Sequence, residues 1–89
     1  MLQNAAPIKT AELTDEELLE LFLSLPNKQR EQRFADTRRT ADLTGLSVRT
    51  IQLWIETGAI RAIVVGKKYR ADLDSLREHL KRQMNDHRF

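Results

Sequence analysis

The 89-residue chain contains no cysteine, two prolines, three glycines and no long apolar run. Without cysteine it has no disulfide framework, no thiolate metal site and no cysteine nucleophile. No apolar segment approaches the roughly 18–20 residues that cross a membrane, and no signal peptide is recognisable, so we expect a cytoplasmic protein with no membrane partner. A chain of this length forms one small domain, which excludes a full dinucleotide-binding domain or a barrel.

The charge is small in total but uneven along the chain. The net charge is +2. Residues 1–26 carry one lysine against five acids, a net charge of −4, whereas residues 27–70 carry ten bases against four acids, a net charge of +6. This distribution favours a basic working face within the second segment.

The first helix signal is a capping box formed by Thr14 and Glu17, and Pro26 ends the helix after Leu25. Its apolar sector covers about 200°, which is wider than the usual single core face. The helix either packs only on its own domain or also contacts a partner. We favour a partner, namely a homodimer formed through this N-terminal helix. The residues expected at that contact are Leu19, Phe22 and Leu23.

Two further helices follow in quick succession. Asp36 is placed to cap a short helix that Gly45 ends, and Ser47 is placed to cap a helix that runs to Thr57, before Gly58. Two helices joined by a short turn that contains glycine form the helix-turn-helix unit. We expect the first helix to brace the second, whose outer face can enter the major groove of DNA.

The rest of the chain predicts a β-hairpin and a last helix. The β-branched run 60–65, the turn around Gly66 and residues 69–70 form the hairpin, which makes a wing beside the helix-turn-helix. Asp72 is placed to cap the last helix. One apolar stripe of that helix contains Leu73, Leu76, Leu80 and Met84.

Side chains that can contact DNA bases or phosphates lie on the outer face of the second predicted helix and on the wing. Arginine can bond guanine, glutamine can bond adenine, and leucine or a threonine methyl can contact thymine methyl groups. Cations on the wing contact phosphates. The predicted DNA-binding residues are Arg38, Arg39, Ser47, Arg49, Thr50, Gln52, Leu53, Lys67, Lys68 and Arg70. Duplex binding also predicts that Arg38, Arg49, Lys67 and Arg70 share one face.

Residues 38–80, with 34–37 leading in, resemble the excisionase-type winged helix-turn-helix domains, which are relatives of the MerR-type DNA-binding domain. The segments that carry the resemblance are TADLTGLS at 40–47, RTIQLWI at 49–55, GAI at 58–60 and AIVVGKKYR at 62–70. The resemblance implies a small transcriptional regulator or a recombination directionality factor. The family usually has acidic residues where this chain has Arg38 and Arg39, and a nearby phosphate would account for these cations at a helix N-terminus.

The fold class expected is mainly α with a small β-hairpin, a winged helix-turn-helix with an added N-terminal helix. Residues 1–33 hold a leader, the acidic amphipathic helix and a basic stretch over 27–33 that is either a linker or a helical extension. Residues 34–89 form the DNA-binding domain. We expect double-stranded DNA as the partner, no enzymatic activity, no small-molecule substrate and no cofactor.

Three other functions are weaker: metal binding, protein–protein interaction and RNA binding. His79 and His87 with nearby acids do not form a recognisable zinc site, because zinc requires three or four converging ligands. The competing function is a protein–protein interaction module that works through the leucine-rich N-terminal helix. RNA binding ranks third, since A-form RNA lacks a wide major groove.

Overall fold

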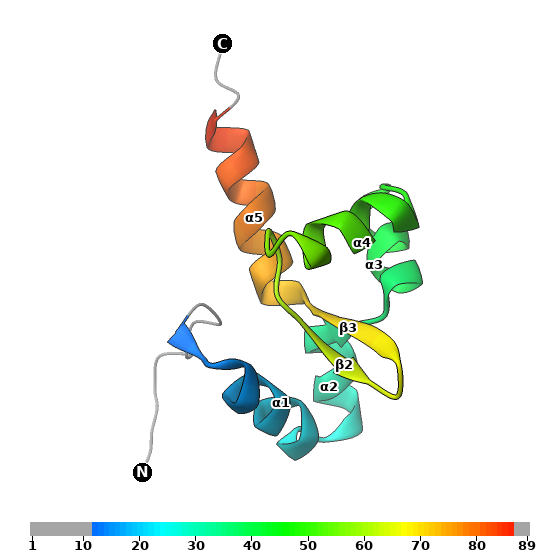
Figure 1. Ribbon diagram of the computed structural model, residues 1–89, viewed down its shortest axis with the longest axis vertical. Helices are drawn as coiled ribbons and strands as arrows, with labels where there is room; N and C mark the ends of the chain where they lie inside the picture. The colour runs from blue at the N-terminus through cyan, green and yellow to red at the C-terminus, as the bar shows by residue number, and fades with distance from the viewer. Residues whose placement is uncertain (1–11, 87–89) are drawn as a thin grey trace.

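A computed structural model describes residues 12–86, and over this range it contains five helices and three short strands. The first eleven residues of the leader and the last three residues, including His87, lie outside the described residues. The elements are α1 (Asp15–Ser24), α2 (Asn27–Arg33), β1 (Phe34–Ala35), α3 (Thr37–Thr44), α4 (Val48–Glu56), β2 (Ala62–Val65), β3 (Lys68–Asp72) and α5 (Leu73–Asp86). The predicted fold class is confirmed: the chain is mainly helical, with a small antiparallel sheet (Figure 1).

The strands form one antiparallel sheet in the order β1-β3-β2. The predicted hairpin is β2–β3, with Val65 opposite Lys68 beside the turn. The sequence did not predict β1, which pairs Phe34 with Asp72 and Ala35 with Ala71. Residues 27–33, whose sequence allows either a linker or a helix, form α2. Strand β1, which directly follows α2, therefore attaches α2 to the end of the hairpin that is far from its turn.

One face of the sheet carries the core of the helix-turn-helix. Ala35 and Ala71 lie opposite each other across the strands and pack with fully buried Ile51 of α4. Leu76 of α5 lies in the same core. Met84 was predicted to continue the buried stripe of the last helix, and this is wrong: its side chain is 76% exposed because the end of α5 extends beyond the core (Figure 1).

The other face of the sheet is covered by α1. Leu18 and Phe22 are buried there against Phe34 and Ile63, and the rings of Phe22 and Phe34 meet edge to face at 5.1 Å. Each such side chain contributes about 1.5–3 kcal/mol on burial. Phe22 was predicted to contact a partner; instead it lies in the core of its own chain, because α1 directs the Leu18–Phe22 side at the sheet.

Two arginines from outside α1 hold its ends. Arg30 of α2 donates to the carbonyl oxygens of Phe22, Leu23 and Leu25, which the helix leaves without intrahelical donors at its C-terminus. At the other end, Arg61 donates to the carbonyl oxygen of Leu13 at 2.7 Å and to Oδ1 of Asp15 at 2.8 Å. These contacts fix α1 on the domain.

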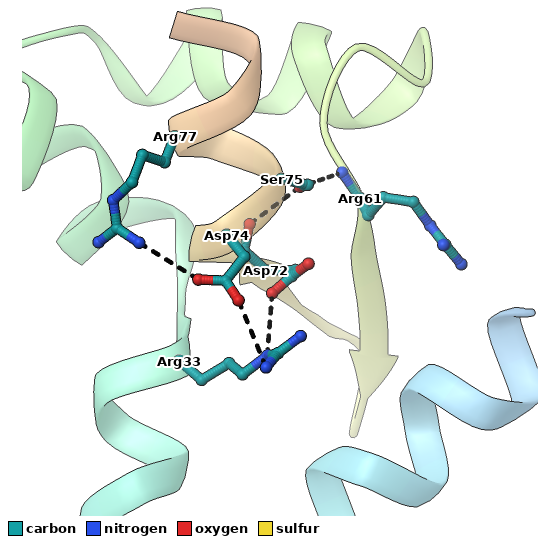
Figure 2. Close-up of polar contacts among 6 residues, drawn as sticks. All are labelled: Arg33, Arg61, Asp72, Asp74, Ser75 and Arg77. Carbon is teal, nitrogen blue, oxygen red and sulfur yellow. Dashed lines mark hydrogen bonds and ion pairs between the residues drawn. The ribbon is translucent and has the colours of Figure 1, made fainter. Parts of the chain in front are cut away.

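A third arginine joins α2 to the end of the sheet. Asp72 was predicted to serve as the cap of the last helix; it is the last residue of β3, immediately before α5, and its side chain is fully buried. Arg33 lies 3.5 Å from Oδ1 of Asp72 and 3.3 Å from Oδ2 of Asp74 (Figure 2). Ser75 donates to the carbonyl oxygen of Asp72 and accepts from the backbone N–H of Arg61.

Candidate nucleic-acid interface

The turn between α3 and α4 is built as the sequence predicts. Gly45 has a φ of 74° and ends α3, donating its N–H to the carbonyl oxygen of Ala41. This left-handed conformation favours glycine because other residues carry a Cβ. Ser47 then caps α4 by accepting from the N–H of Thr50 at 3.1 Å. The two helices meet over a short turn, which orients α4 against α3.

The outward face of α4 carries side chains that can read bases. Arg49, Gln52 and Leu53 are all exposed, Leu53 at 54%, on the side opposite buried Ile51. Leu53 offers an apolar contact to a thymine methyl group in the groove, and Arg49 and Gln52 offer hydrogen-bonding groups to base edges. The hydroxyl of Thr50 lies 3.0 Å from that of Ser47, so these two side chains also serve the cap.

The two arginines in the first turn of α3 differ in their surroundings. Asp36 caps the helix by accepting from the N–H of Arg39 at 2.8 Å. The guanidinium of Arg39 donates to the carbonyl oxygen of Glu31 at 2.6 Å, which joins α3 to α2. Arg38 is exposed. Arg38 is therefore the better placed of the two to contact a phosphate.

The wing ends in a tight two-residue turn. Gly66 and Lys67 both have positive φ, 58° and 68°, which is the conformation of a type I′ hairpin turn. Lys67 and Lys68 are exposed at this tip. The tip and the α3–α4 turn lie on the same side of the molecule in Figure 1. These two lysines are the cations that the hairpin projects furthest from the core.

Arg70 does not share a sheet face with the helix-turn-helix core. It is directly opposite Ile63, so it points to the side of the sheet that α1 covers. Its guanidinium is 3.8 Å from Asp36. It also lines a depression of about 330 Å³ together with Phe22 and Arg30. The alternation of side chains along β3 places it there.

One exposed apolar side chain on the wing, Val64, is not among the residues predicted from sequence. Val64 is 63% exposed and lies opposite Tyr69, on the same face of the sheet as Ala62 and Ala71. That is the face on which α4 packs. The alternation of side chains along a β-strand could have predicted this exposure, because it places Val64 and buried Ile63 on opposite faces of the sheet.

His79 packs against an aromatic side chain of its own domain. Its ring meets that of Trp54 edge to face, with centroids 4.5 Å apart. Within residues 12–86 no three histidine or acidic side chains come together in a way that would hold a metal ion. Over the same residues, no helix has the length and apolar character needed to span a membrane.

Comparison with known protein families gives a match over the helix-turn-helix and the wing. The family described as helix-turn-helix domain matches residues 36–84, which is more than half of the chain. The match begins at Asp36, the cap of α3, and extends through α4 and the wing into α5. No curated protein and no solved structure matches the chain significantly. The chain belongs to the helix-turn-helix domain family, and membership of this family indicates DNA binding.

Proposed function

We propose that this protein binds double-stranded DNA in a sequence-specific manner, with α4 in the major groove and the wing on the phosphate backbone. The observation that carries the proposal is the exposed face of α4, where Arg49, Gln52 and Leu53 stand together on a helix braced by α3. A helix presented in this way fits the roughly 12 Å width of the groove.

The residues divide into base-reading and phosphate-binding groups. Arg49 and Gln52 offer bidentate hydrogen bonds to base edges, and Leu53 with the Thr50 methyl offers apolar contact to thymine. Phosphates are bound by Arg38, Lys67 and Lys68, whose side chains are exposed. Ser47 supports the site as the cap of α4.

Two predicted contacts carry less weight. Arg39 and Arg70 already have partners in the chain, the carbonyl oxygen of Glu31 and the carboxylate of Asp36. A phosphate contact by either arginine replaces or shares that partner. We therefore assign Arg39 and Arg70 a supporting part in binding.

The acidic surface of α1 supports an approach of DNA from the other side. The acids Asp15, Glu16, Glu17 and Glu20 are all exposed. In Figure 1, α1 lies at the end of the molecule away from the α3–α4 turn. Acidic side chains repel phosphates, so their distance from the α3–α4 turn leaves the side that bears α4 free for DNA.

The cellular role that we propose follows the excisionase-like and MerR-like resemblance. The protein acts as a small transcriptional regulator or as a recombination directionality factor, in the cytoplasm and associated with the nucleoid. Its action is non-covalent, in keeping with helix-turn-helix domains, which are typically not enzymes.

Selection of bound duplexes from a random pool tests the proposal. We expect an enriched sequence, and affinity for that sequence that falls with salt. If about five phosphates are neutralised per chain, the slope of log K against log salt is about −4 to −5. A pool without enrichment would contradict sequence-specific binding, and affinity independent of salt would contradict the phosphate contacts.

A second candidate, a protein-interaction module, is favoured by one observation. Leu19 and Leu23 remain exposed on α1 after Leu18 and Phe22 have been buried. This function predicts that substitutions on α1 abolish partner binding while substitutions on α4 do not. DNA binding predicts the reverse for duplex affinity.

A further inference from the structure

We infer that Glu56, the last residue of α4, selects a cytosine in the DNA site, about three base pairs from the base that Arg49 contacts. The inference rests on the proposed function, since it assigns a base to one further residue of the same helix. Three observations carry it: the direction of Glu56, its lack of a partner within residues 12–86, and a charge that the helix itself does not favour.

Glu56 continues the outward side of α4 that contains Arg49, Gln52 and Leu53. These four residues, which we call the outer stripe, stand at i, i+3, i+4 and i+7, the spacing that places side chains on one face of a helix. At about 100° per residue, Glu56 points only about 20° away from Arg49, whereas buried Ile51 points to the opposite side. Glu56 is exposed, so the outer stripe ends in a carboxylate open to solvent.

The chain leaves the outer stripe uncovered beyond Glu56. Gly58 has a φ of 81°, and the backbone then turns inward, so that Ile60 is only 2% exposed before β2 begins (Figure 1). Within residues 12–86, no hydrogen bond or ion pair joins the side chain of Arg49, Gln52 or Glu56 to another residue. All three polar groups of the outer stripe are therefore available to a ligand.

The two charges of the outer stripe do not stabilise α4. Arg49 is a cation in the first turn, beside the positive end of the helix dipole, and Glu56 is an anion at the negative end. Phosphates do not account for Glu56 either, because a carboxylate repels them. A ligand that presents a hydrogen-bond donor to the C-terminal end of α4 accounts for a carboxylate at this position.

Cytosine is the base whose major-groove edge suits a carboxylate best. Its N4 amino group donates, and no acceptor stands beside that group. Guanine and thymine present acceptors, which repel a carboxylate, and adenine places the N7 acceptor next to its donating amino group. Taking a carboxylate out of water without a donor is unfavourable. Glu56 therefore favours cytosine and also disfavours the other bases.

The length of the outer stripe sets the distance between the two bases at its ends. Glu56 follows Arg49 by seven positions, which is about 10.5 Å along the helix. Bases of one strand follow one another at about 3.4 Å, so this length corresponds to about three steps. We therefore expect a guanine at the Arg49 end of the site and a cytosine about three steps away, with the bases read by Gln52 and Leu53 between them.

Selection of bound duplexes with the wild-type chain and with Glu56→Gln tests the inference. Glutamine has nearly the same shape as glutamate but offers both a donor and an acceptor, which match N7 and the amino group of adenine. The wild type should enrich cytosine at one position, and the variant should enrich adenine there while keeping the guanine. Fluorescence anisotropy on the two duplexes should show that the ratio of their affinities changes by about fivefold or more.

Glu20→Gln provides the matched control, because it removes an exposed carboxylate from α1 and should leave every base preference unchanged. Thermal unfolding checks that both variants are folded, as expected for exposed side chains. A Glu56→Gln variant that keeps the wild-type preferences, or that binds all duplexes more tightly without a change of preference, would overturn the inference and leave the proposed function intact. A wild-type pool without any enrichment would instead contradict the proposed function, and the inference with it.

Discussion

The guanidinium of Arg33 lies 3.5 Å from the carboxylate of Asp72, whose side chain is fully buried. The pair joins the end of α2 to the junction between β3 and α5, and Asp74 completes the contact on the solvent side (Figure 2). A buried carboxylate is tolerated only when its charge is compensated. The position of α2, and with it the C-terminal end of α1 that Arg30 holds, depends on this ion pair.

Removal of that arginine should destabilise the fold. Arg33→Met keeps much of the side-chain volume but removes the cation that lies 3.5 Å from the buried carboxylate of Asp72. We predict a loss of about 2–3 kcal/mol in the free energy of unfolding, somewhat less than for a fully buried pair because Arg33 is partly exposed. Urea unfolding measures it. The double variant with Asp72→Asn should recover part of the loss, and an additive further loss would contradict the pairing.

Arg49→Ala tests the reading of bases by α4. The side chain is exposed in the first turn of the helix, so its loss should leave stability within about 0.5 kcal/mol of wild type. Discrimination between the selected duplex and single-base variants should fall by about 1–3 kcal/mol at one position. Fluorescence anisotropy on a set of such duplexes measures this. Equal weakening on every duplex would show that Arg49 contacts only phosphate.

Lys68→Ala tests the wing. Because Lys68 stands at the hairpin tip, we predict weaker binding to all duplexes alike and a salt slope smaller in magnitude by about 1. Lys28→Ala, which removes an exposed lysine from α2, provides the matched control and should change neither quantity. A loss at Lys68 that depended on sequence would show that the wing reads bases.

Lys67→Gly separates stability from affinity. Lys67 has a φ of 68°, a left-handed conformation that costs a residue with a Cβ about 1–2 kcal/mol relative to glycine. Glycine relieves this but loses more entropy on folding, so we predict a net gain of about 0.5 kcal/mol in stability. DNA affinity should nevertheless fall, because one phosphate contact is lost. Thermal unfolding and a DNA titration on the same sample check both signs, and unchanged affinity would remove Lys67 from the interface.

The features predicted from sequence are those fixed by local chemistry. The capping box of Thr14 and Glu17, the cap at Ser47 and the glycine that ends α3 all depend on residues within four positions of one another. Their hydrogen bonds follow from the spacing alone. The helix-turn-helix and its wing were therefore predictable as a series of local signals.

The features that the sequence did not predict depend on contacts between distant residues. Strand β1 has two residues, too few for a periodic signal, and exists because Phe34 and Ala35 pair with β3. Arg61 reaches Asp15, 46 positions away. Phe22 and Leu23 are equally apolar neighbours, and only the packing of α1 on the sheet decides that the first is buried and the second exposed.

The measurement that tests the central claim most directly is NMR of the 15N-labelled chain on addition of a selected duplex. The account predicts that backbone amide shifts change most at residues 47–53 of the α4 segment and at 66–68 of the wing tip, and least along α1. Shift changes concentrated on α1, with α4 unaffected, would contradict the assignment of α4 as the helix that reads DNA.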